Sequence, residues 1–249
     1  MKKTAMKLAI IGLTLSLSAA PALASTGLVV LVASNATAST TEVAEAYQKT
    51  HPDVKILIWP ASSKVIATQV ERGAEADLVL ISKAVADGTK GLETPAKIFS
   101  NHTVVSINKT SKIKTAKDLA SAGVRLVGGT SGSVQYEITD ETINNLGKTY
   151  GANFAKKAKE NIQFTKTSSE QAEKAVEDGV VDAGIVFAAD AATNKTIVLD
   201  LGDKTVVAQY VTAMVTTSKN ATQVKDLVTF MNGNEAQAIF RKHHHDPVK

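Results

Sequence analysis

The sequence predicts an α/β protein with two lobes, each a mainly parallel sheet flanked by helices. Short apolar runs typical of buried strands alternate with helical patterns, and this alternation favours parallel strands joined by right-handed crossovers. The 249 residues are 44% hydrophobic, enough for a sizeable core in one large or two ordinary domains. We find neither a repeat of fixed period nor a low-complexity linker, so we expect one two-lobed body rather than separate domains.

Residues 1–24 are expected to be a cleavable signal peptide. Three lysines lie among the first seven residues, and an apolar run from Leu8 to Ala20 follows them. This run is shorter than the ~20 residues that a transmembrane helix needs. Ala22-Leu23-Ala24 then offers small residues before a cleavage site at Ser25. Because the chain has no cysteine for a lipid anchor, the predicted location is the periplasm of a Gram-negative cell.

Composition and charge exclude several classes of function. The absence of cysteine excludes a disulfide framework, a thiolate zinc site, an iron–sulfur cluster and a cysteine nucleophile. Removing the three signal-peptide lysines from 28 basic residues leaves 25, against 24 acidic residues. Such a balanced chain lacks the basic surface that nucleic-acid binding requires. We therefore expect no nucleic-acid partner, and nothing in the sequence calls for a cofactor or a metal.

The expected elements follow each other in a regular order. Apolar runs predict strands at residues 28–32, 54–59, 77–81, 104–107, 124–127, 183–187, 197–199 and 206–215. Helical spacing is found at residues 43–47, 65–70, 135–147, 151–159 and 168–178, and in one amphipathic segment over 223–240. Pro60 is expected to end the second strand. Lobe 1 should comprise residues 25–105 and 209–249, and lobe 2 residues 106–208, with a hinge near Val104–Asn108 and Ala208–Val215.

Three loops rich in hydroxyl groups each separate a strand from a helix. They are Ser34-Asn35-Ala36-Thr37, Pro60-Ala61-Ser62-Ser63, and Gly128 through Ser133. Ligands of open α/β sheets bind beyond the carboxyl ends of the strands, and helix N-termini favour anions. Taken singly, each loop is better explained by helix caps and turns, and it is the three loops together that make a ligand site an equally good interpretation. Arginine occurs only three times, so an anion site formed by these loops would depend on neutral donors.

An enzyme remains an alternative on the same residues. The glycine-rich loop has neither the lysine of a Walker A motif nor the spacing of a nucleophile elbow. A secreted hydrolase using Ser63 or Ser133 would need a histidine, and the candidates are His51, in a polar turn, and His102, without an evident acid partner. The tail 243–246, His-His-His-Asp, is interpreted as a mobile polar segment rather than as a metal site.

Five segments carry a resemblance to a known family. They are Tyr47–Pro52, Ala61–Ser63, Gln69–Leu78, Asp178–Ala191 and Glu235–Phe240. Through them the mature chain resembles the periplasmic molybdate-binding proteins, which capture molybdate and tungstate for ABC importers. The resemblance implies the type II periplasmic-binding-protein fold, in which two hinged lobes close on a tetrahedral oxyanion. It also implies a monomer without catalytic activity that delivers the anion to an inner-membrane ABC permease.

The resemblance further implies which residues bind the ligand. The family's first serine falls on Asn35, and the second is retained as Ser63, next to Ser62. A turn that supplies a backbone donor appears as Gln135-Tyr136-Glu137, and a further donor falls near Ser169. The family's ligand tyrosine falls on Phe187, which lacks the hydroxyl. The expected ligand-binding residues are Asn35, Ser62, Ser63, Tyr136, Ser169 and Phe187.

These replacements leave two ligand classes open. In a repacked oxyanion site, the Asn35 amide and the Ser169 hydroxyl donate, and Tyr136 supplies the hydroxyl that Phe187 lacks. A lost donor to a charged acceptor costs about 1–3 kcal/mol, and Glu137 would repel a dianion unless it points away. Alternatively, the same fold binds a small organic anion or a polar metabolite for uptake or sensing, with the rings of Phe187 and Tyr136 facing it.

Overall fold

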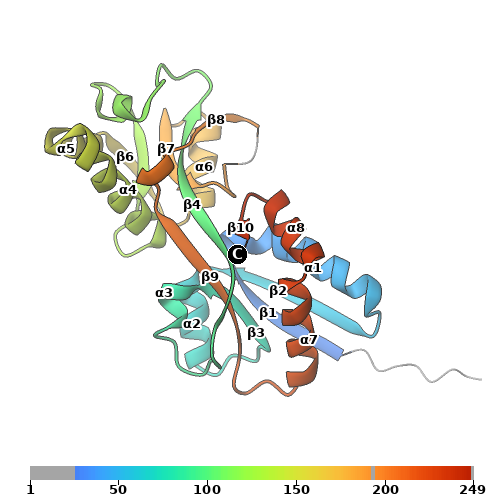
Figure 1. Cartoon of the computed structure of the whole chain (residues 1–249). Helices are drawn as coiled ribbons and strands as arrows, with labels where there is room; N and C mark the ends of the chain where they lie inside the picture. The colour runs from blue at the N-terminus through green and yellow to red at the C-terminus, as the bar shows by residue number, and fades with distance from the viewer. Residues whose placement is uncertain (1–25, 192–193, 248–249) are drawn as a thin grey trace, which may run out of the picture.

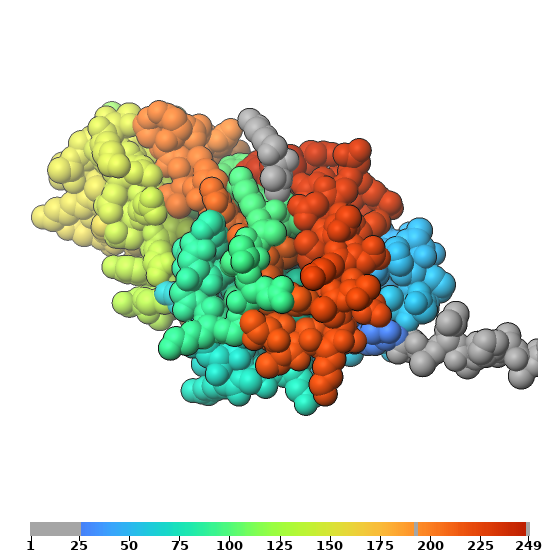
Figure 2. Space-filling view, turned by 60° about the horizontal axis from the view of Figure 1, so that its bottom comes forward, coloured from blue at the N-terminus to red at the C-terminus, as the bar shows by residue number. Residues whose placement is uncertain are grey.

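The computed structural model describes residues 26–191 and 194–247, which form two lobes connected by crossing strands (Figure 1). The expected signal peptide lies outside these residues. In the described part, one continuous path of strands runs in the order β2-β1-β3-β9-β4-β7-β5-β6, and both β8 and the short β10 (Asp246–Pro247) pair with β4. Figure 2 shows the lobes from another side, with the yellow-green residues around α4 and α5 at one end and the blue N-terminal residues at the other. Across the described ranges, no helix is both long and apolar enough to cross a membrane.

Lobe 1 is a sheet covered on both faces. Its strands are β1 (Thr26–Ala33), β2 (Val54–Ala61) and β3 (Leu78–Ser82), which are parallel, and β9 (Val207–Met214), which is antiparallel to β3. One face packs against α1 (Thr37–Thr50), α7 (Ala221–Asn232) and α8 (Asn234–Lys242). The other packs against α2 (Ser63–Glu71) and α3 (Lys83–Ala86). Coverage of both faces explains why the strands are continuous apolar runs.

Lobe 2 repeats this plan. The parallel strands are β5 (Leu126–Gly129), β6 (Ile162–Lys166) and β7 (Ala183–Phe187), and β4 (Ala96–Asn108) is antiparallel to both β7 and β8 (Thr196–Leu199). One apolar cluster contains α4 (Val134–Tyr150) and α5 (Ala152–Glu160), and another contains α6 (Ser169–Glu177). The short 3₁₀ helices are η1 (Ser34–Ala36), η2 (Ala116–Ala120) and η3 (Gly202–Lys204). Each lobe therefore has its own core.

Strand β4 belongs to both lobes. Its first half, up to His102, pairs with β9, and its second half, from Thr103, pairs with β7 and β8. The returning chain is held to the same point, because the Thr205 hydroxyl donates to the Thr103 carbonyl at 2.6 Å and the Val206 N–H donates to Thr103 Oγ1 at 2.9 Å. The lobes are thus connected at residues 102–103 and 205–207. The expected lobe boundaries and the hinge motion stay predictions.

Local details differ from the expectation at three places. Pro60 does not end β2, because β2 is an edge strand and tolerates a residue without an N–H. Strand β6 has mostly exposed side chains, so no apolar run reveals it. The segment 223–240 is two helices, which meet at Gly233 in an extended conformation (φ −74°, ψ 163°). A Cβ at Gly233 would lie 3.1 Å from the Phe230 carbonyl oxygen, so glycine suits this break.

The histidine tail is part of the fold, and its interpretation as a mobile segment is wrong. His245 is 2% exposed and stacks on Phe99 with ring centroids 4.1 Å apart. Its Nε2 lies 3.0 Å from Ser39 Oγ, and His243 Nε2 lies 2.8 Å from a carboxylate oxygen of Glu42. Burial lowers the pKa of His245 to about 3, so this ring is neutral. Among the described residues there is no group of three side chains placed to hold a metal ion.

Candidate functional site

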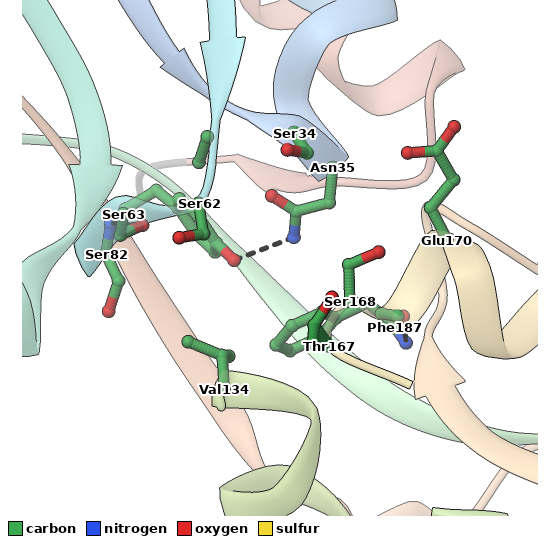
Figure 3. A pocket seen from close by; sticks show the side chains of 13 residues that line it. Ser34, Asn35, Ser62, Ser63, Ser82, Val134, Thr167, Ser168, Glu170 and Phe187 are labelled. Atoms are coloured by element: carbon green, nitrogen blue, oxygen red, sulfur yellow. Dashed lines mark hydrogen bonds between the residues drawn. The ribbon is translucent and has the colours of Figure 1, made fainter. Parts of the chain in front are cut away.

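A pocket lies between the two lobes, where the parallel strands of both lobes end (Figure 3). Its wall consists of Ala33, Ser34, Asn35, Ser62, Ser63, Ser82 and Tyr210 from lobe 1 and of Val134, Thr167, Ser168, Ser169, Glu170 and Phe187 from lobe 2. Five of the six residues expected from the sequence are in this set, and Tyr136 is not. The carboxyl ends of parallel strands meet at one edge of a sheet, and this brings the hydroxyl-rich loops together.

The two serines of lobe 1 have different local roles. Ser62 is the N-cap of α2, and its Oγ accepts the Val65 N–H at 3.3 Å. Ser63 is only 5% exposed, and its Oγ accepts the Ser82 N–H at 3.1 Å. In both bonds the serine oxygen is the acceptor. Each hydroxyl therefore keeps its own hydrogen for a ligand in the pocket.

Asn35 is held by a residue distant in the sequence. Its Nδ2 donates to the Tyr210 hydroxyl at 2.7 Å, the bond that is dashed in Figure 3. Tyr210 is 3% exposed, and its ring stacks on Phe99 at 5.2 Å and meets Phe187 edge-on at 6.4 Å. Burial raises the pKa of the Tyr210 phenol far above its ordinary value, so the phenol stays protonated. Sequence reasoning placed Tyr210 in the strand 206–215, and no local motif marked it as a site residue.

Lobe 2 presents its serines at the N-terminus of α6. Ser168 is the N-cap, and its Oγ accepts the Gln171 N–H at 3.3 Å. Ser169 is buried, and its Oγ accepts the Phe187 N–H at 2.8 Å. The Ser169 hydroxyl also interacts with the Asp190 carboxyl, whose pKa burial raises to about 7 despite that contact. Asp190 Oδ2 is buried without a hydrogen-bond partner among the described residues, as suits a carboxyl that is protonated near neutral pH.

Helix N-termini from both lobes converge on this pocket. Helices α2, α4 and α6 begin at the lining residues Ser63, Val134 and Ser169, and η1 begins at Ser34. The first N–H groups of a helix have no intrahelical acceptor, and the helix dipole adds partial positive charge there. Within the described lining, no side chain is cationic and Glu170 alone is acidic. Its carboxylate points away from the serines of lobe 1 in Figure 3. The pocket is thus suited to an anion held by neutral donors.

The segment Gln135-Tyr136-Glu137 forms the first turn of α4, so its backbone lies at a helix N-terminus that begins at a lining residue, but none of its three side chains is in the described wall. Val134 of that turn faces the pocket, whereas Tyr136, two positions along the helix, is 44% exposed and lies outside it. The Gln135 amide donates to the Ile185 carbonyl at 2.7 Å inside lobe 2. The Tyr136 hydroxyl therefore does not replace the one that Phe187 lacks.

Glu137 is paired with a lysine of the opposite lobe. Lys64 Nζ, at the start of α2, lies 2.8 Å from Glu137 Oε1 and donates to the Gly132 carbonyl at 3.0 Å. Glu137 is not a lining residue, so the repulsion of a dianion that its position suggested does not arise. The ion pair instead connects the lobes beside the pocket.

The residues of the hydrolase alternative lie apart. His51 stacks on Tyr47 at 4.0 Å, and His102 Nδ1 lies 2.9 Å from Asp246 Oδ2, an acid partner that the sequence did not reveal. Neither ring is in the described wall of the pocket. Ser133 Oγ accepts the Tyr136 N–H as the N-cap of α4. No histidine therefore stands beside Ser63 in the described pocket.

A two-lobed α/β fold with a donor-lined pocket between its lobes is typical of the solute-binding proteins. The chain belongs to the family of bacterial extracellular solute-binding proteins, whose sequence profile matches residues 28–245. The family description gives it an extracytoplasmic location. The match extends to His245, in agreement with the packing of that ring in the core of lobe 1.

Three individual proteins illustrate the similarity. A Bacillus subtilis protein named as a substrate-binding lipoprotein of ABC transporters is 24% identical over 227 residues, which cover 87% of this chain and 85% of the relative. The substrate-binding domain of a molybdenum ABC transporter from Clostridium difficile superimposes with a TM-score of 0.73 at 24% identity, covering 90% and 100% of the two chains. PEB3 of Campylobacter jejuni with bound L-phospholactate gives 0.73 at 19% identity, covering 89% and 100%. These structures confirm the predicted type II fold.

Proposed function

We propose that this protein is the solute-binding component of an ABC importer and captures a tetrahedral oxyanion, with molybdate or tungstate preferred to sulfate and phosphate. The observation that carries the proposal is the pocket between the lobes, whose described wall offers hydroxyls and helix N-termini and contains no cation. The Bacillus and Clostridium relatives, named for ABC transport and molybdenum, support the same assignment.

The donor chemistry explains why an oxyanion suits the pocket. A tetrahedral dianion presents four oxygens as acceptors, and the wall provides the hydroxyls of Ser62, Ser63 and Ser168 together with the first N–H groups of α2 and α6. Neutral donors and helix dipoles stabilise such an anion. Without a buried cation to pair with, the anion is released more readily than from an arginine clamp. Reversible capture is what delivery to a transporter requires.

Binding is coupled to closure of the lobes. Because the wall comes from both lobes, a ligand makes its full set of contacts only when they are close together, and it therefore stabilises the closed state. The chain segments at 102–103 and 205–207 are the connections about which the lobes rotate. The closed protein, a monomer in the periplasm after removal of its signal peptide, docks on an inner-membrane permease. No catalytic step is part of this function.

Thermal unfolding of the mature, ligand-free protein tests the proposal. The panel contains molybdate, tungstate, sulfate, phosphate and several organic acids, with sodium chloride at equal ionic strength as the control. A ligand at 100 times its dissociation constant stabilises the folded state by about 2.7 kcal/mol. For a domain of this size each kcal/mol raises the midpoint by about 2–4 °C. Large shifts are expected with molybdate and tungstate, and a flat response to all four oxyanions would contradict the proposal.

A second candidate is the same fold with a small organic anion as its ligand. The apolar side chains of Ala33, Val134 and Phe187 in the wall favour it, as does the bound L-phospholactate of PEB3. A competition experiment separates the two candidates. An organic acid that raises the unfolding midpoint and is not displaced by excess molybdate would identify this second function.

A further inference from the structure

Tyr210 is a buried residue of the pocket wall that no sequence motif marks as part of the site. It lies on β9, whose chain continues from the connection between the lobes at 205–207, and it is 3% exposed. Phe99 stacks on its ring and Phe187 meets it edge-on, so the position of the phenol is determined by packing on both sides. Such a ring cannot turn its hydroxyl away from the pocket without disturbing both neighbours.

The hydrogen bond to Asn35 determines what this hydroxyl can do. An amide nitrogen is a donor only, so in the contact of 2.7 Å from Asn35 Nδ2 the phenolic oxygen is the acceptor. The phenolic hydrogen is not used in that bond, and the described residues provide no acceptor for it. Donation from Asn35 also polarises the phenol and makes it a stronger donor. A buried donor without an acceptor is costly, and the pocket is where an acceptor can bind.

We propose that Tyr210 is a ligand-binding residue, whose O–H donates to the bound anion while Asn35 holds the phenol oxygen. This inference rests on the proposed function, because it names a further contact of the same site. The charge state of Tyr210 agrees with a role as a donor, because burial and the nearby Asp190 carboxyl keep its phenol protonated. The contact adds a donor from lobe 1 at the wall opposite α6.

The test compares Tyr210→Phe with Tyr136→Phe by isothermal titration calorimetry against molybdate and tungstate. Tyr210→Phe keeps both ring contacts and removes only the hydroxyl, so the affinity should fall by about tenfold or more, as expected for a hydrogen bond to a charged acceptor. The matched control removes the hydroxyl of Tyr136, which is exposed and outside the pocket, and should bind like the wild type. Equal affinities of Tyr210→Phe and the wild type would overturn the inference.

Two readouts separate direct contact from an effect through Asn35. In an Asn35→Ala background, Tyr210→Phe should still weaken binding if the phenol contacts the anion, and should change nothing if it only orients the amide. The tyrosine ultraviolet difference spectrum on binding should disappear in Tyr210→Phe and persist in Tyr136→Phe. Its persistence in Tyr210→Phe would overturn the inference. If the wild type bound neither anion, the proposed function would be overturned as well. If the wild type and Tyr210→Phe bound the anions equally well, only the role of Tyr210 would be overturned.

Discussion

The two walls of the pocket contain the same type of residue in different surroundings. In lobe 1, Ser63 accepts one backbone N–H and keeps its own hydrogen for a ligand. In lobe 2, Ser169 likewise accepts a backbone N–H, but its hydroxyl also contacts the buried Asp190 carboxyl. A serine at a helix N-terminus is thus a free donor in one wall and is partly engaged in the other. Its availability depends on what lies behind the helix.

The walls also differ in their electrostatics. The wall of lobe 1 contains the neutral Asn35 and Tyr210, whereas in lobe 2 the hydroxyl of Ser169, at the start of α6, contacts the Asp190 carboxyl, whose pKa burial raises to about 7. The Asp190 carboxyl is compatible with an anion nearby only while it is protonated. The comparison therefore predicts that the affinity for an anion falls as the pH rises through 7, mainly through the wall of lobe 2, where Ser169 contacts Asp190.

The largest effect is expected for Ser63→Ala. Loss of a hydroxyl donor to an anion should lower the affinity for molybdate by about tenfold or more, as measured by isothermal titration calorimetry. Ser169→Ala should lower it less, because its hydroxyl is already engaged. Ser121→Ala, outside the pocket, is the control. An unchanged affinity for Ser63→Ala would remove this residue from the site, and equal losses for both pocket serines would end the distinction between the walls.

A second effect should be seen in the pH dependence of stability. The pKa of Asp190 is about 7 in the folded protein against an ordinary 3.8, so the folded state holds this proton in a range where the unfolded chain has lost it. The stability from this group is fully present below about pH 4 and is lost as the pH rises through 7. Asp190→Asn has no ionisable group at this position and therefore does not lose this stability as the pH rises. Its unfolding midpoint, relative to the wild type, should increase from pH 5 to pH 8 by at least about 3 °C, or roughly 1 kcal/mol.

The matched control is Asp53→Asn, a substitution at an exposed residue. The difference between its unfolding midpoint and that of the wild type should be the same at pH 5 and at pH 8. If Asp190→Asn also showed a constant difference, Asp190 would be ionised throughout, and the electrostatic contrast between the walls would be wrong. Molybdate titrations of the same proteins extend the test, since wild-type affinity should fall from pH 5 to pH 8 more steeply than that of Asp190→Asn.

The smallest effect is expected for the ion pair between the lobes. Glu137→Gln removes the ion pair with Lys64, in which both side chains are exposed. Pairs of this kind contribute about 0.2–1 kcal/mol, so the affinity should fall by less than about fivefold, and high salt should reduce the difference further. Asp87→Asn instead breaks an ion pair within lobe 1, between Lys83 at the start of α3 and the residue that caps its end, and should leave the affinity unchanged. If Glu137→Gln and Asp87→Asn lowered the affinity by similar amounts, the ion pair would not act by connecting the two lobes.

Much of the site could be predicted because it depends on strand ends. Asn35, Ser62 and Ser63 follow buried strands directly, and the carboxyl ends of such strands meet at one edge. Ser169 was predictable from the resemblance and from its helix start. The side chain of Tyr136 lies outside the pocket, because in the first turn of α4 it is Val134 that occupies the pocket side.

The sequence by itself determined the order of strands and helices, the helix caps at Ser62 and Ser168, and the gathering of neutral donors at one edge. These features depend on residues a few positions apart, whose periodicity and hydrogen bonding are local. Only the tertiary structure decided that Tyr210 meets Asn35 across 175 positions, that the Asp190 carboxyl contacts Ser169 of α6, and that Lys64 reaches Glu137. Each of these follows from chain crossings that bring distant segments together, and no local pattern encodes them.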